Sequence, residues 1–193
     1  MRFIAHMRYG MDFRAVLRLI EEDFSRENIR WALIGGFALG ALGIHRATID
    51  LDFIIHSGDL EKVDKIMRTH DYRCVYKSDE VAQYVCQAKI FGEIDFILAH
   101  RNISYKMLER AQDKEIFSRT VKVLRPEDII GLKIQALAND ETRVSKEYSD
   151  IESLLGLYKK DLDWALLEEY FRLFDLGHKY QEYKNKYYAE RAR

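Results

Sequence analysis

The sequence predicts a mixed α/β (α+β) fold, in which helices flank a small mixed β-sheet and a C-terminal helical subdomain follows. Residues 31–55 show a buried strand, a glycine turn, a short helix and a second strand. Strand and helix patterns alternate up to residue 124, and from Pro126 onward only helical patterns remain. We therefore expect a core over residues 1–125 and a helical subdomain over residues 126–193.

Length and composition restrict the classes of function. A chain of 193 residues with 48% hydrophobic residues can form one packed domain, or a core with a small appendage. Lysine and arginine number 31 against 32 acidic residues, so the net charge of −1 gives no global indication of nucleic-acid binding. No apolar run approaches the roughly 18 residues of a membrane span. With two cysteines and no secretion signal, we expect a cytoplasmic protein.

The other elements follow from hydrophobic periodicity and turn residues. In the first part of the chain, helical spacing of apolar residues predicts helices over residues 11–28, 60–67 and 102–112. Segments rich in β-branched and aromatic residues predict strands over residues 72–76, 81–86, 89–98, 115–117 and 120–124, with a hairpin joining the first two. The missing N–H of Pro126 suits a helix start. Further helices are expected over residues 126–138, 142–158, 162–174 and 177–193.

A glycine pair follows the first strand of residues 31–55. Gly35 and Gly36 have no Cβ, so the backbone can turn sharply there and approach a ligand closely. The short helix predicted from Phe37 begins at the same place. Its free N–H groups and positive dipole end suit a phosphate.

Two acids lie in the predicted strand over residues 49–55. Asp50 and Asp52 are two residues apart, so both carboxylates should lie on one strand face. Like charges about 4 Å apart repel by roughly 4 kcal/mol at an effective dielectric near 20. A divalent cation removes that cost, and ligands that are all oxygen favour magnesium or manganese over zinc. The alternative is a solvated edge strand with two unrelated acids.

Three features together resemble a known superfamily. They are the Gly35-Gly36 turn, the run Arg-Ala-Thr-Ile-Asp-Leu-Asp at residues 46–52, and Asp95 within Glu-Ile-Asp-Phe-Ile at residues 93–97. The combination resembles the DNA polymerase β-like nucleotidyltransferases. Within that superfamily, the run at residues 46–52 looks most like the abortive-infection type toxins of type IV toxin–antitoxin systems and their small relatives.

The resemblance implies a reaction and a metal site. A nucleoside monophosphate would move from a nucleoside triphosphate such as ATP to an acceptor, with release of pyrophosphate. Asp50 and Asp52 would bridge two Mg²⁺ (or Mn²⁺) ions that lie roughly 4 Å apart. Asp95 would hold the second ion and accept the proton of the attacking hydroxyl. Glu93 lies on the same strand face and is the alternative for this role, and a simple surface acid is the alternative for Asp95.

The resemblance also implies a phosphate-binding set. Gly35 and Gly36 would cradle the triphosphate through backbone N–H groups. Many members carry serine as the second residue of this turn, and its hydroxyl contacts a phosphate. This chain has Gly36 there, so another side chain must supply that contact. Thr48 and Arg46 are the candidates. A bidentate contact of Arg46 with phosphate competes with an ion pair inside its own loop.

A lysine and an aspartate complete the predicted site. Lys133 lies among apolar residues of the helix that begins at Pro126. In the family a helix lysine at this place reaches the phosphates. An aspartate one helix later completes the site or orders the lysine, and Asp150 matches that position. The alternative for Lys133 is an ordinary exposed lysine whose stem is buried. The alternative for Asp150 is a simple surface acid.

The acceptor is left open by the sequence. In the superfamily acceptors include RNA ends such as tRNA, proteins and aminoglycosides. The toxin resemblance implies a cognate antitoxin as partner, and a homodimer is one alternative for the oligomeric state. The tyrosines and lysines that alternate over residues 178–193 would stack on RNA or pack within the protein. Two other functions remain: a nucleotide- or RNA-binding module without catalysis, and an aminoglycoside-type nucleotidyltransferase.

Overall fold

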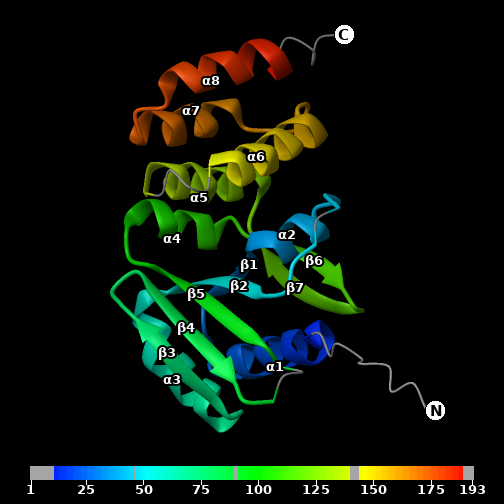
Figure 1. The fold of residues 1–193 in the computed structure, drawn as a ribbon, viewed down its shortest axis with the longest axis vertical. Helices are drawn as coiled ribbons and strands as arrows, with labels where there is room; N and C mark the ends of the chain where they lie inside the picture. Colours follow the sequence, from blue (N-terminus) through cyan, green and yellow to red (C-terminus); the bar gives the residue numbers. More distant parts are fainter. Residues whose placement is uncertain (1–10, 46, 89–90, 140–143, 189–193) are drawn as a thin grey trace, which may run out of the picture. The chain divides into compact units, whose positions relative to one another are not determined.

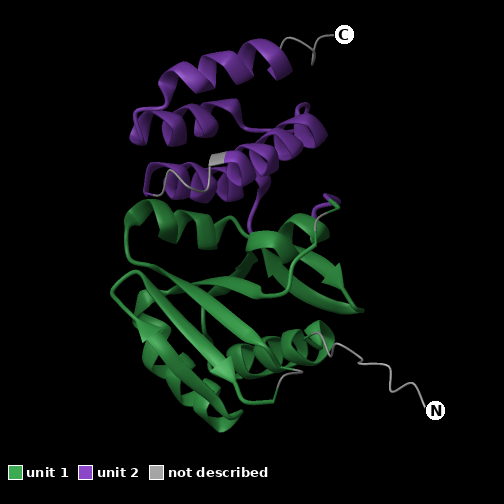
Figure 2. Cartoon of the chain, in the orientation of Figure 1, with its two compact units in different colours: residues 1–41, 45–123 green, residues 42–44, 124–193 purple. Residues whose placement is uncertain are grey.

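The computed structural model describes residues 11–45, 47–88, 91–139 and 144–188 (Figure 1). The predicted mixed α/β architecture is confirmed within these residues. Contacts divide the chain into a sheet unit, residues 1–41 with 45–123, and a helical unit, residues 42–44 with 124–193 (Figure 2). Whether residues 1–125 and 126–193 are separate domains stays a prediction, because compactness alone does not show independent folding. Among the described residues, no helix has the length and apolar character needed to cross a membrane.

The sheet unit combines seven described strands with four α-helices. The strands are β1 (Trp31–Ile34), β2 (Leu51–His56), β3 (Tyr72–Lys77), β4 (Val81–Cys86), β5 (Glu93–Ala99), β6 (Gln112–Ile116) and β7 (Arg119–Val123). The helices are α1 (Phe13–Arg26), α2 (Gly35–Ala41), α3 (Leu60–Thr69), which follows a 3-10 turn at Ser57–Asp59, and α4 (Asn102–Glu109). The strand order is β3-β4-β5-β2-β1-β7-β6.

Strands β1, β2 and β5 form the centre of this mixed sheet. β2 runs antiparallel to β1 and parallel to β5, and β1 runs parallel to β7. The other pairs are the hairpins β3–β4 and β6–β7 and the antiparallel pair β4–β5. All four residues of β1 are buried, which fits a strand paired on both edges and covered on both faces.

The two faces of the sheet carry different helices. α1 and α3 cover one face, and α2 and α4 lie over the other (Figure 1). On the first face, aromatic rings of α1, β1, β2, β4 and β5 contact one another in a continuous cluster: Phe24, Trp31, Phe53, Tyr84 and Phe96. The rings of this cluster are buried, so the alternate residues of β2 and β5 must point to the other face.

The segment before β2 differs from its predicted form. We expected a strand from residue 49, but β2 begins at Leu51. The Thr48 hydroxyl donates to the Asp50 carboxylate over 2.6 Å and also reaches the Asp50 backbone oxygen over 3.3 Å. Local hydrogen bonds of this kind compete with a β ladder. Asp50 therefore lies immediately before the strand, while Asp52 lies within it.

The helical unit consists of α5 (Pro126–Asn139), α6 (Val144–Tyr158), α7 (Trp164–Leu173) and α8 (Gly177–Tyr183). A π-helical turn at Lys184–Tyr188 follows α8. Tyr180, Tyr183 and Tyr187 are buried, and the Tyr180 hydroxyl donates to the Trp164 backbone oxygen over 3.0 Å. These three rings therefore pack within the helical unit and are not available to stack on RNA.

Candidate active site

Three polar side chains form a row across neighbouring strands of the sheet unit. Asp52 of β2 is the register partner of Asp95 of β5, and Asp95 is the register partner of Gln83 of β4. Residues in register point to the same face, here the face of α2 and α4. Gln83 donates from Nε2 to Oδ2 of Asp95 over 3.3 Å. The sheet thus brings together two carboxylates that are 43 residues apart in the sequence.

The glycine turn lies directly against this row. Gly35 follows β1 with a φ of +66°, a conformation that favours glycine over all other residues. A Cβ added to Gly35 would stand 1.8 Å from Oδ2 of Asp52. No other residue type fits between this turn and the carboxylate. The turn at Gly35 therefore lies in direct contact distance of the Asp52 carboxylate.

The electrostatic environment of Asp95 is unfavourable to its charged form. Burial raises the pKa of the Asp95 carboxyl above its ordinary value, and the negative charges of Asp50 and Glu93 raise it further. The hydrogen bond from Gln83 lowers this pKa and so acts against the increase. Asp50 therefore lies near enough to act on Asp95 electrostatically. Glu93 lies on the same face, opposite Val85, and is exposed.

Of the two loop side chains predicted to contact phosphate, the structure describes only one. Thr48 donates to the Asp50 carboxylate. Arg46 lies outside the described residues. A pocket of about 590 Å³ borders this region, and Gly36, Phe37, Thr48 and Phe117 are among the residues that line it. A reactant held beside the acids therefore has an apolar aromatic surface next to it.

The donor set of the row fits a hard divalent cation. Asp52 and Asp95 face each other in register and carry only oxygen donors, and Asp50 contributes a third carboxylate nearby. A cation held by these carboxylates would offset the negative charge of Asp50, which together with burial raises the pKa of Asp95. In the described part of the chain, no group of three or more acidic, histidine or cysteine side chains is already arranged as a metal cage. The metal assignment of Asp50, Asp52 and Asp95 stays a prediction.

Comparison with known proteins supports the same interpretation. Residues 4–183 match the profile of a family described as uncharacterised nucleotidyltransferase. The chain belongs to this nucleotidyltransferase family. No curated protein matches the sequence significantly.

Solved structures share the fold of this nucleotidyltransferase. ANT(2'')-Ia in complex with adenylyl-2''-tobramycin is 16% identical, with a TM-score of 0.60 over 83% of this chain and 95% of that one. The lincosamide adenylyltransferase LnuA, bound to lincomycin, is 12% identical, with a TM-score of 0.55 over 77% and 99%. An antigenic nucleotidyltransferase-like protein from Paracoccidioides brasiliensis is 17% identical, with a TM-score of 0.54 over 89% and 90%. At these identities the likeness shows the fold alone.

The two predicted residues of the helical unit contact each other. Nζ of Lys133 on α5 donates to Oδ2 of Asp150 over 2.5 Å and to Oε2 of Glu147 over 2.7 Å, both on α6. The three side chains are more than 90% buried. The idea that an aspartate orders the lysine thus has a structural basis. A contact of this lysine with phosphate remains a prediction.

Two members of these clusters were not identified from the sequence as site residues. Gln83 is a polar residue of β4, and the residues on either side of it, Ala82 and Tyr84, are buried in the core. That alternation places Gln83 on the opposite face, but only the β4–β5 register shows that it meets Asp95. Glu147 lies three residues before Asp150 on α6, a spacing that puts both on one helix face. This spacing could have identified the second partner of Lys133.

Proposed function

We propose that this chain is a divalent-metal-dependent nucleotidyltransferase that moves a nucleoside monophosphate from a nucleoside triphosphate to an acceptor and releases pyrophosphate. The observation that carries the proposal is the register of Asp52 with Asp95 beneath Gly35. Family membership supports the general reaction. A sheet that serves only as structure gains nothing from two facing carboxylates, because their repulsion costs stability.

In this proposal the side chains of the row, together with Asp50 and Thr48 beside it, have distinct roles. Asp50, Asp52 and Asp95 would hold Mg²⁺ or Mn²⁺, which when bound neutralises negative charge on the carboxylates and on the phosphates. Asp95 would in addition accept a proton from the acceptor hydroxyl. Gln83 keeps the Asp95 carboxylate in place, and Thr48 does the same for Asp50.

Backbone N–H groups and two cationic side chains are candidates for the remaining contacts to the nucleotide. Gly35 and Gly36 would offer N–H groups to the triphosphate, since neither carries a side chain that blocks the approach. Arg46 and Lys133 are retained as candidates for contacts with phosphate. Asp150 would then order the lysine through the hydrogen bond that joins them.

The acceptor is proposed as a small molecule, with an RNA end or a protein as alternatives. Two of the three named structural neighbours carry adenylyl-2''-tobramycin and lincomycin, respectively. One observation favours a cationic acceptor of the aminoglycoside kind: Glu93 is an exposed acid on the same face of the sheet as Asp95, and the proposed metal site does not use it. The toxin type, with a cognate antitoxin, predicts growth arrest on expression and reversal by a neighbouring gene product.

Labelled nucleotide transfer tests the proposal. Each of the four nucleoside triphosphates, labelled at the α-phosphate, is incubated with Mg²⁺ or Mn²⁺ and with tobramycin, lincomycin, tRNA or total protein. We expect transfer by the wild type and a loss on the order of 100-fold or more in Asp52→Asn, since about 1.4 kcal/mol of lost transition-state stabilisation is tenfold in rate. Asp79→Asn, an exposed acid in the β3–β4 turn, is the matched control and should keep the wild-type rate.

Two outcomes would contradict the proposal. Equal rates in the wild type and Asp52→Asn would remove the acids from catalysis. Binding of a nucleoside triphosphate in calorimetry without transfer to any acceptor would favour the silent binding module. Transfer to tobramycin but not to tRNA or protein would identify the aminoglycoside-type alternative.

A further inference from the structure

A second cavity lies at the other end of β2. It is a groove of about 700 Å³, and the residues that line it come from α1, β1, β2, α4 and the β6–β7 hairpin of the sheet unit. His56, at the end of β2, lies in its wall, four residues after Asp52. Four residues of strand span about 13 Å. The groove is therefore separate from the acidic row.

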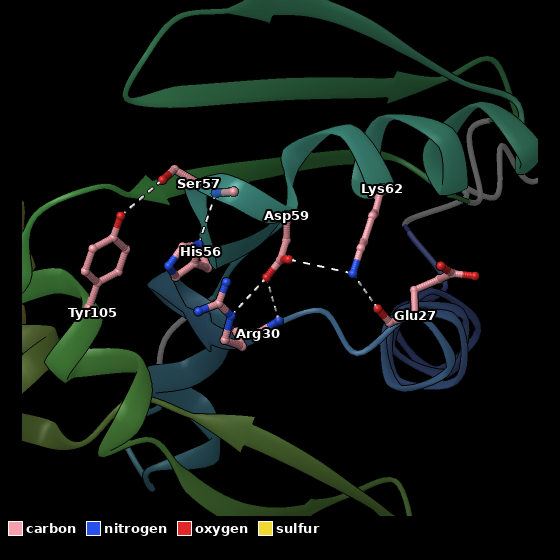
Figure 3. Close-up of polar contacts among 8 residues, drawn as sticks. Glu27, Arg30, His56, Ser57, Asp59, Lys62 and Tyr105 are labelled. Carbon is pink, nitrogen blue, oxygen red and sulfur yellow. Dashed lines mark hydrogen bonds and ion pairs between the residues drawn. The ribbon is translucent and has the colours of Figure 1, made fainter.

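Two cationic or donor groups in the groove are held in fixed orientations. Arg30 offers both its backbone N–H and its Nε to Oδ2 of Asp59, each over 3.2 Å, and Asp59 is 6% exposed (Figure 3). The His56 ring lies parallel to the Tyr105 ring, with 4.4 Å between centroids and 13° between planes. Nδ1 of His56 accepts from the Gly58 N–H over 3.0 Å. Contacts with Asp59, Gly58 and Tyr105 thus fix the orientation of both side chains.

These contacts fix what the two side chains can donate. Burial and the nearby Arg30 charge lower the pKa of His56, so the ring is neutral at pH 7. Because Nδ1 accepts a hydrogen bond, the neutral ring carries its proton on Nε2. In the described residues no hydrogen bond or ion pair engages Nε2 of His56 or the two Nη groups of Arg30. Three donor groups remain for a ligand.

The other charges of the groove are largely neutralised within the protein. Glu21 accepts from Arg119 over 2.6 Å, and Lys122 contacts Asp113 over 2.8 Å. Glu109 is the remaining acid, one helical turn after Tyr105 on α4. Arg30 is itself ion-paired with Asp59 through Nε, so the cationic donors that face the groove are its two Nη groups. The apolar wall of the groove comes from Ile29, Trp31 and Leu108.

We propose that this groove binds a small ligand that joins an anionic oxygen group to an apolar or aromatic body, with the anion on Arg30 and His56. A phosphomonoester and a carboxylate share this chemistry. Charge-assisted hydrogen bonds from Arg30 supply most of the affinity, since its planar donors match both groups. The volume lies within the range of small-molecule sites. The proposal does not depend on the function proposed for the acidic row.

NMR titration of the ¹⁵N-labelled full chain in EDTA tests this site with four probes: phenyl phosphate, benzoate, benzyl alcohol and inorganic phosphate. We expect phenyl phosphate or benzoate to shift the Trp31 indole and the His56 ring signals, and to leave the Gly35 and Gly36 amides unchanged. Benzyl alcohol should bind at least tenfold more weakly. The tighter of the two anions shows whether the ligand is a phosphate or a carboxylate.

Variants separate a binding site from a merely polar surface. Arg30→Gln keeps an amide for Asp59 but should weaken anion binding at least tenfold, and Arg26→Gln, on an exposed arginine of α1, should not change it. Ser25→Trp fills the groove without altering the Arg30–Asp59 pair and should abolish binding. Glu109→Gln removes the remaining acid and should strengthen it several-fold.

The proposal is overturned if benzyl alcohol binds as tightly as the anions, or if no probe shifts Trp31 and His56 at about 10 mM, a concentration that detects even weak sites. Shifts that persist unchanged in both Arg30→Gln and Ser25→Trp would also overturn it. Nucleotide transfer measured on the same variants reports independently on the acidic row. The two proposals can therefore fail separately.

Discussion

The sheet unit and the helical unit each bring carboxylates together, and they differ in what surrounds those carboxylates. In the sheet unit Asp95 faces Asp52 in register, and its hydrogen bond comes from the neutral amide of Gln83. In the helical unit Asp150 and Glu147 share the ammonium group of Lys133. The helical cluster contains its own cation. Asp95 instead has two further acids, Asp50 and Glu93, acting on it.

The difference indicates how each cluster of carboxylates affects the stability of the fold. Buried charges are tolerated when they are paired, so the packing of α5 against α6 accommodates the lysine cluster only while all of its partners are present. Like charges that raise the pKa of a neighbouring carboxyl reduce stability, and such arrangements persist where a ligand or a reaction uses them. To bind phosphate, Lys133 would have to do so while still bonded to Glu147 and Asp150, or else release them. We therefore expect substitution of Lys133 to change the free energy of unfolding before any other property.

The largest effect is expected from Lys133→Met. The substitution leaves Glu147 and Asp150 buried without the lysine, and breaking a buried pair in this way costs about 3–5 kcal/mol. Urea unfolding measures the free energy of unfolding. Lys65→Met, on an exposed position of α3, should change it by less than about 0.5 kcal/mol.

A triple variant sharpens this test. Lys133→Met combined with Glu147→Gln and Asp150→Asn removes the two charges as well, so it should recover much of the loss. If Lys133→Met alone costs less than about 1 kcal/mol, the cluster does not hold the two helices together and the contrast between the units fails.

Gly35→Ala should have the next largest effect. The added Cβ would stand 1.8 Å from the Asp52 carboxylate, and the φ of +66° is unfavourable for alanine. Overpacking and the left-handed conformation together predict a loss of about 2–4 kcal/mol in the free energy of unfolding. Nucleotide transfer should fall with it, because the turn and the carboxylate can no longer keep their places.

Gly40→Ala is the matched control in the same helix. A Cβ at Gly40 meets no atom within 4 Å, so alanine should stabilise α2 by about 0.5–1 kcal/mol. Thermal unfolding monitored by circular dichroism compares the two variants. A Gly35→Ala protein as stable as Gly40→Ala would show that the turn does not press on the acid.

Hydrophobic periodicity and turn residues predicted many of the helices and strands. They did not predict which strands, distant in the sequence, pair with each other. The buried strand expected before the glycine turn is present as β1, Trp31–Ile34, because four apolar residues precede Gly35. The predicted hairpin partner strand, Val81–Cys86, agrees as well. The start of β2 was misplaced because Thr48 binds Asp50, a contact that hydrophobic alternation does not report.

The candidate site shows the same limit. The glycine pair and the spacing of Asp50 and Asp52 are local, so the sequence reveals them directly. The position of Asp95 beside Asp52 depends on the parallel pairing of β5 with β2, and the resemblance to a known superfamily supplied what periodicity could not. Gln83 had no such support, because an amide on a strand is a common surface residue.

A smaller effect is expected from Asp95→Asn on stability without metal. The folded state raises the pKa of Asp95, so its contribution is neutral at pH values below the ordinary carboxyl pKa. As the pH rises through the folded pKa, the charged carboxylate increasingly destabilises the fold. Asparagine removes that cost, so the variant should be more stable at pH 7, by less than about 1 kcal/mol because water screens a half-exposed group.

Mg²⁺ should reverse the order of the two proteins. A cation that binds the folded state stabilises the wild type and leaves Asp95→Asn nearly unchanged. Thermal melts at pH 4 and pH 7, with and without the metal, measure both effects. A wild type that is more stable than the variant without metal at pH 7 would contradict the assigned repulsion.

The smallest effect is expected at Gln83, which tests how the sheet unit moderates its own acids. The Gln83 amide lies 3.3 Å from the Asp95 carboxylate and lowers its pKa. Gln83→Leu removes that hydrogen bond, so the pKa of Asp95 should rise and the acid limb of the transfer rate should move to higher pH. Since one such bond contributes about 1 kcal/mol, the rate on that limb should fall by less than tenfold.

Gln83→Glu extends the series in the same direction. A third carboxylate in the row should move the acid limb of the transfer rate to a higher pH than Gln83→Leu does. In Gln83→Leu the rate at high pH should change little. A structural defect would instead lower the rate at every pH. An acid limb that stays in place in both variants would mean that Gln83 does not tune Asp95, and that the row functions through its two aspartates alone.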